Sequence, residues 1–334
     1  MVKTPIDTQV AFLRNRLRWY GWASLSRLNN FDPVKDLLIV SSPRGGSSWL
    51  MELIATMPGT AVLWEPLHPK AVRSERVAAL HNAWRQHIPE GANWKEARQA
   101  FDLILRGRVM NDWTGSQSSV AGFIAAKQLV VKFCRAHTML PWLISNFRFK
   151  YAPIYLVRHP FAVVASQMRE RGWEHGKSSF VIPDARYNEF YGKHHEFLQR
   201  LSTEEEIRVA NWCLCNQYLL RHGGNNKSWI TVYYEHLLSE PRKEIKRIFE
   251  RWRLKVPANI SAQIRKPSKT TNRFTAVKGV ERQLSKWRSY FDTDQIDRMM
   301  NVLRYFKVEC YGLDTFPRGS GNARREPGLT EAAE

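Results

Sequence analysis

Short apolar runs alternate with stretches of helical periodicity along most of the chain. The clearest case spans residues 37–57, where four apolar residues precede a small polar loop and then apolar residues at helical spacing. An apolar run bounded by polar residues is typical of a strand buried on both faces of a parallel sheet. Four further runs predict strands at residues 61–64, 129–131, 154–157 and 229–233. The alternation predicts an α/β fold, a single domain with a central parallel sheet flanked by helices.

Helical periodicity between these runs predicts the flanking helices. They are expected at residues 81–87, 94–106, 160–168, 204–221 and 241–252. Residues 170–206 are polar, with interleaved aromatic residues and histidines, which indicates an excursion from the sheet.

The two ends of the chain differ from the domain between them, which we expect at residues 36–317. Residues 1–35 mix aromatic and basic residues in an amphipathic pattern. This segment is either a helix packed on the domain with its basic face in water, or an interfacial helix that contacts anionic lipid. Residues 318–334 form a polar tail, which we expect to be disordered.

The net charge of the chain indicates which kinds of partner it can bind. Its 334 residues include 51 Lys and Arg against 31 Asp and Glu, a formal net charge of +20, and 43% are hydrophobic, enough for a large core. Such a surplus favours anionic partners. The basic residues are spread along the chain without a tail-like block, and no RNA-binding signature or zinc-finger spacing is present. We therefore expect an anionic cofactor and acceptor, and no nucleic acid.

Cysteines and hydropathy predict the compartment. The four cysteines include no CxxC pair and no obvious disulfide framework, which favours a reducing compartment. No apolar run reaches the ~18–20 residues of a membrane span, and the N-terminus lacks a secretory pattern. These features predict a cytoplasmic protein. No cluster of metal-ligating residues is evident.

The loop after the first strand has the composition of an anion site. The first N–H groups of a helix lack internal partners, and the helix dipole makes that end positive. The loop adds a guanidinium, two glycines that permit close backbone approach, and two hydroxyls. These residues are Arg44, Gly45, Gly46, Ser47 and Ser48.

Charged residues recur at the strand ends. Arg44, Glu65, Lys132 and Arg158 each follow a predicted strand, and the carboxyl ends of parallel strands share the edge where ligands bind. Three cations and one carboxylate are therefore expected in one crevice. Ser166 lies eight residues after Arg158 within the following helix, so both side chains can reach one phosphate.

Two of these motifs resemble those of sulfotransferases, which use the donor PAPS (3′-phosphoadenosine 5′-phosphosulfate). Residues 43–49 resemble the loop that binds the 5′-phosphosulfate, and Arg158 with Ser166 resembles the 3′-phosphate motif. Many members have Ser at the position of Gly45. The resemblance covers roughly residues 36–315. It implies a P-loop NTPase-like sulfotransferase fold, PAPS as donor, PAP as product and no required metal.

The resemblance also implies roles for the loop residues. Arg44 would hold the bridging and leaving oxygens with help from Lys132, as cations do in phosphoryl transfer. Backbone amides from Gly46 to Trp49 would cradle the 5′-phosphate. The Trp49 ring either stacks on the adenine or packs in the core.

Two segments nearer the C-terminus also resemble the family. Residues 232–238 resemble a Tyr-Glu-Asp-Leu strand end, which we interpret as structural. Residues 283–287 resemble the loop that closes over the nucleotide in tyrosylprotein and carbohydrate sulfotransferases, which implies donor contacts for Ser285 and Lys286. Lys278 and Gly279 match a Lys-Gly pair of cytosolic members, and only one of the last two matches is expected to hold.

A hydroxyl acceptor needs a general base. Cytosolic sulfotransferases use a His two residues after the lysine at the third strand end, and Cys134 stands there in this chain. Tyrosylprotein and several carbohydrate enzymes use a Glu after the second strand, which Glu65 matches. The alternative for Glu65 is a structural ion pair or helix cap. His68 and His137 are weaker candidates for the base.

The acceptor class stays broad at this point: a hydroxylated small metabolite, a carbohydrate or a glycolipid. Two other functions remain open. One is a nucleotide phosphotransferase of P-loop ancestry, although the only Gly-Lys-Ser, at residues 176–178, follows no predicted strand as a Walker A motif would. The other is a non-enzymatic basic protein that binds nucleic acid or a membrane surface.

Overall fold

The computed structural model describes residues 21–22, 24–27, 30–68, 77, 80, 86–170, 178–270 and 279–319. Several predictions lie outside these residues. They are most of the N-terminal amphipathic segment and its membrane contact, most of the helix expected at 81–87, Lys278, and nearly all of the polar tail.

Five parallel strands form one sheet, as predicted from the apolar runs, and their order is β2-β3-β1-β4-β5. The order places β1, which precedes the glycine-bearing loop, at the centre of the sheet. The strands are β1 (Leu37–Ser41), β2 (Thr60–Trp64), β3 (Gln128–Phe133), β4 (Ile154–Val157) and β5 (Ile230–Tyr233).

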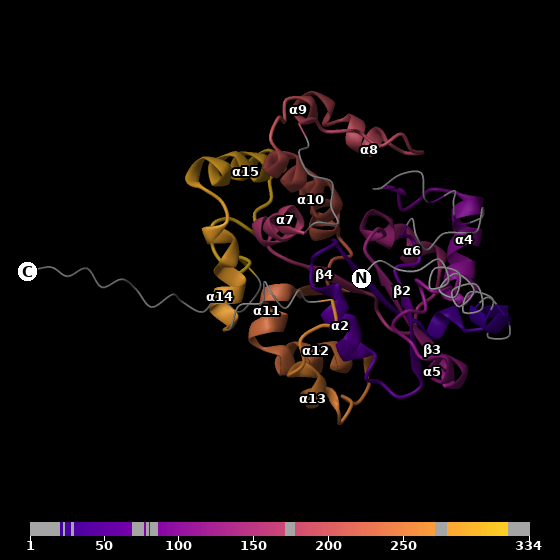
Figure 1. Cartoon of the computed structure of the whole chain (residues 1–334). Coiled ribbons are helices and arrows are strands. Elements are labelled where there is room, and N and C mark those ends of the chain that lie inside the picture. Colours follow the sequence, from indigo (N-terminus) through magenta and orange to yellow (C-terminus); the bar gives the residue numbers. More distant parts are fainter. Residues whose placement is uncertain are drawn as a thin grey trace, which may run out of the picture.

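Helices lie on both faces of the sheet (Figure 1). Short 3₁₀ turns occur at Pro33–Lys35, His137–Met139 and Lys286–Ser289. The α-helices in the first half are α2 (Ser47–Ile54), α4 (Lys95–Leu105), α5 (Val120–Ala125), α6 (Leu140–Asn146) and α7 (Pro160–Arg169). Those in the second half are α8 (Glu189–Gly192), α9 (His195–Gln199), α10 (Glu204–Arg221), α11 (Tyr234–Ser239), α12 (Pro241–Trp252), α13 (Ile260–Ile264), α14 (Val280–Ser285) and α15 (Thr293–Tyr305).

Alternation of side chains along the strands divides the core into two layers. Leu38 and Val40 of β1 belong to one buried cluster, which includes apolar residues of α4, α6, α7 and α10. Leu37 and Ile39 belong to the other, which includes residues of α2, α11 and α12. The sheet is therefore sandwiched between helices, which explains why its strands are apolar throughout.

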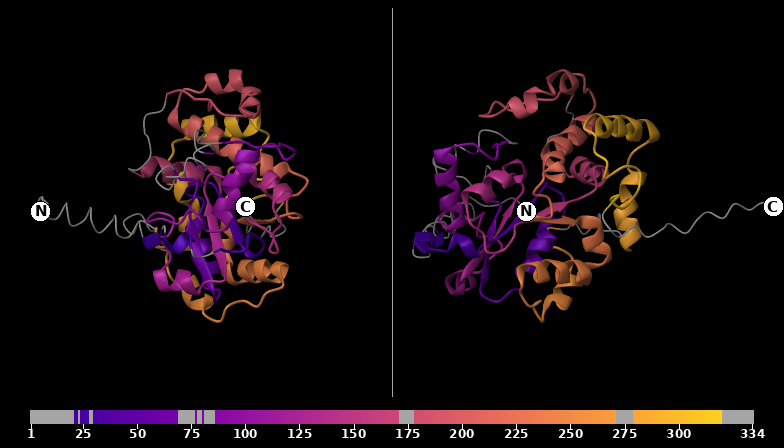
Figure 2. Two further views of the ribbon diagram at one scale, coloured as in Figure 1. Left: turned by 90° about the vertical axis from the view of Figure 1, so that its right-hand side faces the viewer. Right: turned by 180° about the vertical axis from the view of Figure 1, so that it is seen from behind.

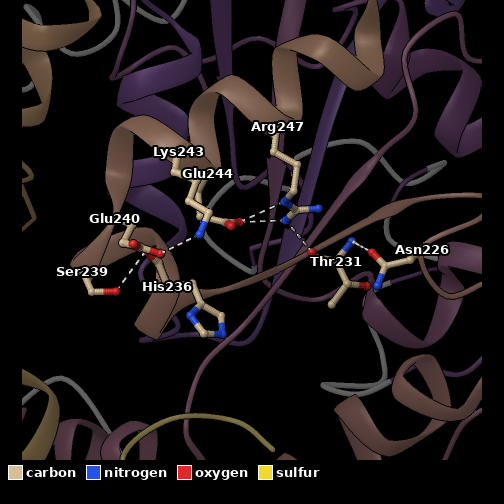
Figure 3. Close-up of polar contacts among 8 residues, drawn as sticks. All are labelled: Asn226, Thr231, His236, Ser239, Glu240, Lys243, Glu244 and Arg247. Atoms are coloured by element: carbon tan, nitrogen blue, oxygen red, sulfur yellow. Dashed lines mark hydrogen bonds and ion pairs between the residues drawn. The ribbon is translucent and has the colours of Figure 1, made fainter. Parts of the chain in front are cut away.

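Both edges of the sheet are covered. At β5, the Thr231 N–H donates to Asn226 Oδ1 and the Thr231 carbonyl accepts from Arg247 of α12, both at 2.9 Å (Figure 3). Glu244 holds that guanidinium at 2.7 Å. At β2, the Ser118 hydroxyl accepts from the Val62 N–H at 2.7 Å. Backbone N–H and C=O groups left unpaired at a sheet edge can pair with a strand of another chain. The contacts above provide hydrogen-bond partners for some of these groups within the protein itself.

Some elements differ from the sequence prediction. Lys132 lies inside β3 rather than beyond its end, because it pairs with Trp64 of β2 and β3 continues to Phe133, which pairs with Val40 of β1. The short helices α5, α6, α8, α9, α11, α13 and α14 were not predicted. The excursion at residues 178–206 contains α8 and α9, which lie beyond α10 at the far end of the molecule from α12 (Figures 1 and 2).

Candidate active site

The carboxyl ends of the strands border one cavity of about 610 Å³. Two predicted site residues, Gly45 and Ser285, do not line it; the Ser285 hydroxyl donates instead to the Glu281 carbonyl at 2.8 Å within α14. The structure thus brings most of the predicted residues together from distant parts of the chain. Those that line the cavity are Arg44, Gly46, Ser47, Ser48, Trp49, Glu65, Lys132, Arg158, Ser166 and Lys286.

The loop between β1 and α2 requires its glycines. Gly46 has φ 93°, and a Cβ there would lie 2.3 Å from the Tyr234 ring. A Cβ on Gly45 would lie 2.3 Å from the Ser41 hydroxyl. Gly46 is the N-cap of α2 and makes no side-chain cap hydrogen bond, so the first amides of α2 are available to an anion.

One detail of the predicted phosphate cradle is corrected. The Trp49 N–H already donates to the Gly46 carbonyl at 3.1 Å. This 3₁₀-type bond tightens the first turn of α2, so the amides left for a phosphate are those of Gly46, Ser47 and Ser48.

Arg44 lies at the centre of the cavity contacts. Its Nε donates to the Ser166 hydroxyl at 3.0 Å, and its terminal nitrogen pairs with Glu170 at 2.9 Å. Its carbonyl accepts from Arg158 at 3.1 Å. Burial lowers the pKa of the Arg44 guanidinium, and the Glu170 carboxylate opposes that shift. The two motifs recognised separately in the sequence, residues 43–49 and Arg158 with Ser166, are therefore in direct contact.

Arg158 and Lys286 add two further cations. The Arg158 guanidinium lies 4.5 Å above the Tyr234 ring, and its buried Nε has no hydrogen-bond partner within the described part of the chain. Burial lowers the pKa of Lys286, and the nearby charges of Arg169 and Arg158 lower it further. Cations held close together in this way favour an anionic ligand.

Glu65 forms a buried ion-pair cluster. Lys132, 2% exposed, donates to one carboxylate oxygen of Glu65, and Arg135 lies 3.4 Å from the other. Lys132 also lies over the Trp64 ring at 4.0 Å. Burial would raise the pKa of Glu65, but the charges of Lys132 and Arg135 outweigh burial and hold that pKa below its usual range. Glu65 is therefore ionised at neutral pH and able to accept a proton.

The other groups considered as a base are less suitable. Burial raises the pKa of the Cys134 thiol to about 11, so the thiol keeps its proton at neutral pH. His137 is 3% exposed, does not line the cavity, and has a pKa lowered to about 4 by burial. His68 lines the cavity, where its ring stacks on Trp113 with centroids 4.3 Å apart.

Several cavity residues were not predicted from the sequence. Tyr234 belongs to the segment interpreted as structural; its neighbour Glu235 does fit that interpretation, since its buried carboxylate accepts from the His159 N–H and the Tyr311 hydroxyl. Residues 264–268 line the cavity because Glu52 of α2 binds the end of this segment, at the Ser268 hydroxyl and the Lys269 N–H, both at 3.0 Å. Glu52 and Ser268 are more than 200 residues apart in the sequence, so no local sequence pattern predicts this contact.

Two features are absent from the residues that the structure describes. Within those residues, no group of three or more His, Cys, Asp or Glu side chains is arranged to hold a metal ion. In the same part of the chain, no helix is both long enough and apolar enough to cross a membrane.

An α/β sheet with an anion loop after its central strand and cations at the neighbouring strand ends is typical of proteins that bind phosphorylated nucleotides at that edge. Residues 34–309 match the family model of the sulfotransferase domain. Because this match covers most of the chain, the protein belongs to the sulfotransferase family and is an enzyme of sulfuryl transfer.

Three solved structures illustrate the similarity of this chain to known proteins. The sulfotransferase domain of the olefin synthase of Synechococcus PCC 7002 is 18% identical, with a TM-score of 0.45, covering 86% of this chain and 97% of that one. Mouse sulfotransferase SULT7A1 complexed with PAP is 14% identical, with a TM-score of 0.41, covering 86% and 88%. Sulfotransferase STF9 of Mycobacterium avium is 14% identical, with a TM-score of 0.41, covering 86% and 79%. No curated protein sequence matches the chain significantly. The family assignment rests on the domain match alone.

Proposed function

We propose that the protein transfers the sulfuryl group of PAPS to an acceptor hydroxyl and releases PAP. The observation that carries this proposal is the meeting of Arg44, Lys132 and Glu65 from three neighbouring strand ends, beside an α2 N-terminus without a side-chain cap. Cations and free amides suit a phosphosulfate, and a carboxylate beside them suits a hydroxyl nucleophile.

Arg44 and the amides of Gly46, Ser47 and Ser48 would bind the 5′-phosphate and stabilise the charge that develops on the oxygen between phosphorus and sulfur. The acceptor oxygen forms a bond to sulfur while that sulfur–oxygen bond breaks, and Glu65 receives the hydroxyl proton. Lys132 would neutralise charge on the sulfuryl oxygens. Positioning and cation stabilisation carry most of the catalysis in the related phosphoryl transfers.

The ion pair between Lys132 and Glu65 would couple donor binding to activation of the acceptor hydroxyl. A carboxylate paired with an ammonium is a weak base, because its pKa lies below the usual range. A phosphosulfate competes with Glu65 for Lys132. Binding of the donor would therefore weaken the ion pair, raise the proton affinity of Glu65 and prepare it as base.

The 3′-phosphate of the donor would be held by Arg158, Ser166 and Lys286. A buried guanidinium Nε without a hydrogen-bond partner among the described residues supports this part of the proposal, because such a donor is costly unless a ligand satisfies it. The Ser166 hydroxyl also lines the cavity and accepts from Arg44 Nε at 3.0 Å, so its own O–H can donate to a phosphate. Ser285 stays a weaker candidate, since its hydroxyl bonds within α14.

Transfer of label from [³⁵S]PAPS tests the proposal. The full chain is incubated with [³⁵S]PAPS and a panel of carbohydrate, glycolipid and phenolic acceptors, and the products are separated. We expect labelled acceptor and PAP, and we expect folded Arg44→Ala to lose transfer almost completely. Near-normal sulfuryl transfer by folded Arg44→Ala would contradict the proposal. So would a protein that is inactive with PAPS but transfers a phosphoryl group from ATP in the presence of Mg²⁺.

A further inference from the structure

Both cations proposed for the phosphosulfate are paired with a carboxylate. Lys132 pairs with Glu65, the proposed base, and Arg44 pairs with Glu170 at 2.9 Å. All four residues line the cavity. The proposed reaction gives Glu65 a proton to accept, but it gives Glu170 no part in the transfer. A second carboxylate thus lies beside the main cation of a site that has to bind an anionic donor.

The position of Glu170 in α7 does not favour the helix. Glu170 is the C-cap of α7, four residues after Ser166. The C-terminal end of a helix carries partial negative charge, so a carboxylate there is unfavourable. The charged contact that Glu170 gains at this position is with Arg44 of the anion loop. A role in ligand binding therefore explains this carboxylate better than a role in the folding of α7.

Other contacts between α7 and the anion loop hold Arg44 without Glu170. The Arg44 Nε donates to the Ser166 hydroxyl at 3.0 Å. The Gln167 amide donates to the carbonyl of Pro43, the residue before Arg44, at 3.3 Å. Loss of the Glu170 charge should therefore leave the loop in place, and a substitution that removes only this charge changes mainly the electrostatics of the cavity.

A bound nucleotide would bring further negative charge to the same guanidinium. Phosphate oxygens that contact Arg44 also come close to the Glu170 carboxylate, and like charges repel. The Arg44 and Glu170 side chains are 29% and 27% exposed, so water screens this repulsion only in part. The nucleotide either displaces the carboxylate from Arg44 or binds beside it, and both arrangements weaken binding.

We infer that Glu170 competes with the nucleotide for Arg44, and that it thereby limits the affinity for PAPS and speeds the release of PAP. This inference rests on the proposed function, because it takes PAP as the product. PAP keeps the 5′- and 3′-phosphates through which the site would hold the donor, so cations alone would release it slowly. Glu170 is then a residue that sets the rate of product release.

Calorimetry of the full chain with PAP tests the inference. Glu170→Gln removes the charge but keeps the size of the side chain and an oxygen that can accept from Arg44. Glu170 makes a further interaction besides this ion pair, so the conservative change is preferred to alanine. Charge-assisted contacts correspond to roughly 10–100-fold and exposed ion pairs to much less, so we expect Glu170→Gln to bind PAP about tenfold more tightly. Stopped-flow measurements should show PAP dissociating more slowly by a similar factor.

Two nucleotides with a single phosphate locate the effect. AMP carries only the 5′-phosphate, which Arg44 would bind, and adenosine 3′-phosphate carries only the other. We expect Glu170→Gln to tighten AMP binding by about the same factor as PAP binding, and adenosine 3′-phosphate binding by clearly less. Asp102→Asn is the matched control, because it removes the same charge from an exposed ion pair with Arg106, outside the residues that line the cavity. It should leave all three affinities unchanged.

The outcomes separate this inference from the proposed function. Unchanged or weaker PAP binding in Glu170→Gln overturns the inference, and weaker binding would show that Glu170 positions Arg44 instead. Equal tightening of PAP and adenosine 3′-phosphate also overturns it, because the charge then does not act through Arg44. Equal tightening of PAP in Asp102→Asn overturns it too, since the effect is then one of net charge. If neither the unmodified protein nor Glu170→Gln binds PAP, the proposed function is refuted instead.

Discussion

Two residues at the centre of the site have unusual backbone conformations. Arg44 and Glu65 have φ angles of 68° and 42°, the left-handed region that side chains other than glycine rarely adopt. Such conformations cost on the order of 1–3 kcal/mol each and persist where the surroundings fix them. Here the Arg44 carbonyl accepts from Arg158, and the Glu65 N–H donates to the Lys132 carbonyl at 2.9 Å. The two strained residues are those with the main roles in the proposed chemistry, Arg44 as the cation at the leaving oxygen and Glu65 as the base.

The role of Glu65 as base makes a prediction for Glu65→Gln. Turnover should fall by about 10²–10⁴-fold, the usual contribution of a general base. Affinity for PAP should change little, because the base acts on the acceptor. Since the Glu65 pKa lies below its usual range, the carboxylate is ionised through neutral pH. The fall of kcat/KM for PAPS on the acid side, which reports ionisation in the free enzyme, should therefore begin only below about pH 4.3, the ordinary pKa of Glu. Steady-state kinetics against pH and PAP calorimetry measure both effects.

The histidine next to the stacked tryptophan provides the matched comparison. If Glu65→Gln turns over normally and His68→Ala is inactive, the base has been assigned to the wrong residue. A drop in PAP affinity as large as the drop in turnover would instead point to a donor-binding role for Glu65.

At the scale of elements, the sequence predicted what local patterns control. All five strands were predicted, because each is an apolar run closed by polar residues. Helices α5, α6, α8, α9, α11, α13 and α14 were missed because each has fewer than eight residues, too few to show a period. The end of β3 was misplaced at Lys132, since its pairing with Trp64 of β2 depends on another strand.

The candidate site likewise contains residues that local sequence patterns predict and residues that they do not. Motif residues such as Arg44 and Arg158 lie at strand ends and could be predicted. The remaining walls depend on contacts between distant segments, and sequence spacing carries no signal for them. The segment at 264–268 lies there because Glu52 holds its end, and Trp113 because it stacks on His68.

The start of α7 is fixed by His159, which also supports Lys286. His159 Nδ1 accepts from the Phe161 N–H at 3.2 Å, so the proton lies on Nε2, which donates to the Gly312 carbonyl at 3.1 Å. Burial lowers the pKa of His159 to about 3, which keeps the ring neutral. The ring stacks on Trp287 with centroids 4.8 Å apart, and Trp287 directly follows Lys286.

Two substitutions at His159 separate its roles. Asparagine retains a helix-capping acceptor and alanine does not, so His159→Ala should unfold about 1 kcal/mol more easily than His159→Asn. Both lose the stack on Trp287 and should weaken PAP binding similarly. Urea unfolding and calorimetry measure these effects. Thr203→Ala, which removes the capping box of α10, is the control that should lower stability without changing PAP affinity. Unchanged PAP affinity in His159→Asn would show that the stack does not position Lys286.

At the scale of the whole molecule, the strand order organises the chemistry. Strand β1 lies between β4, which leads to Arg158, and β3, which carries Lys132. The anion loop after β1 therefore lies between the proposed 3′-phosphate contact and the ion pair that contains the proposed base. The family match covers all of these elements, residues 34–309, which fits a single catalytic unit.

Recognition of the 3′-phosphate tests the central claim most directly, because PAPS and PAP carry this group and the ATP and AMP of a phosphotransferase do not. Calorimetric titration of the full chain with PAP and with AMP compares two nucleotides that differ in that phosphate alone. We expect PAP to bind much more tightly than AMP. Arg158→Ala should weaken PAP binding by roughly 10–100-fold, and Ser166→Ala by up to about tenfold, with little effect on AMP. Equal affinity of the unmodified protein for PAP and AMP would contradict the account.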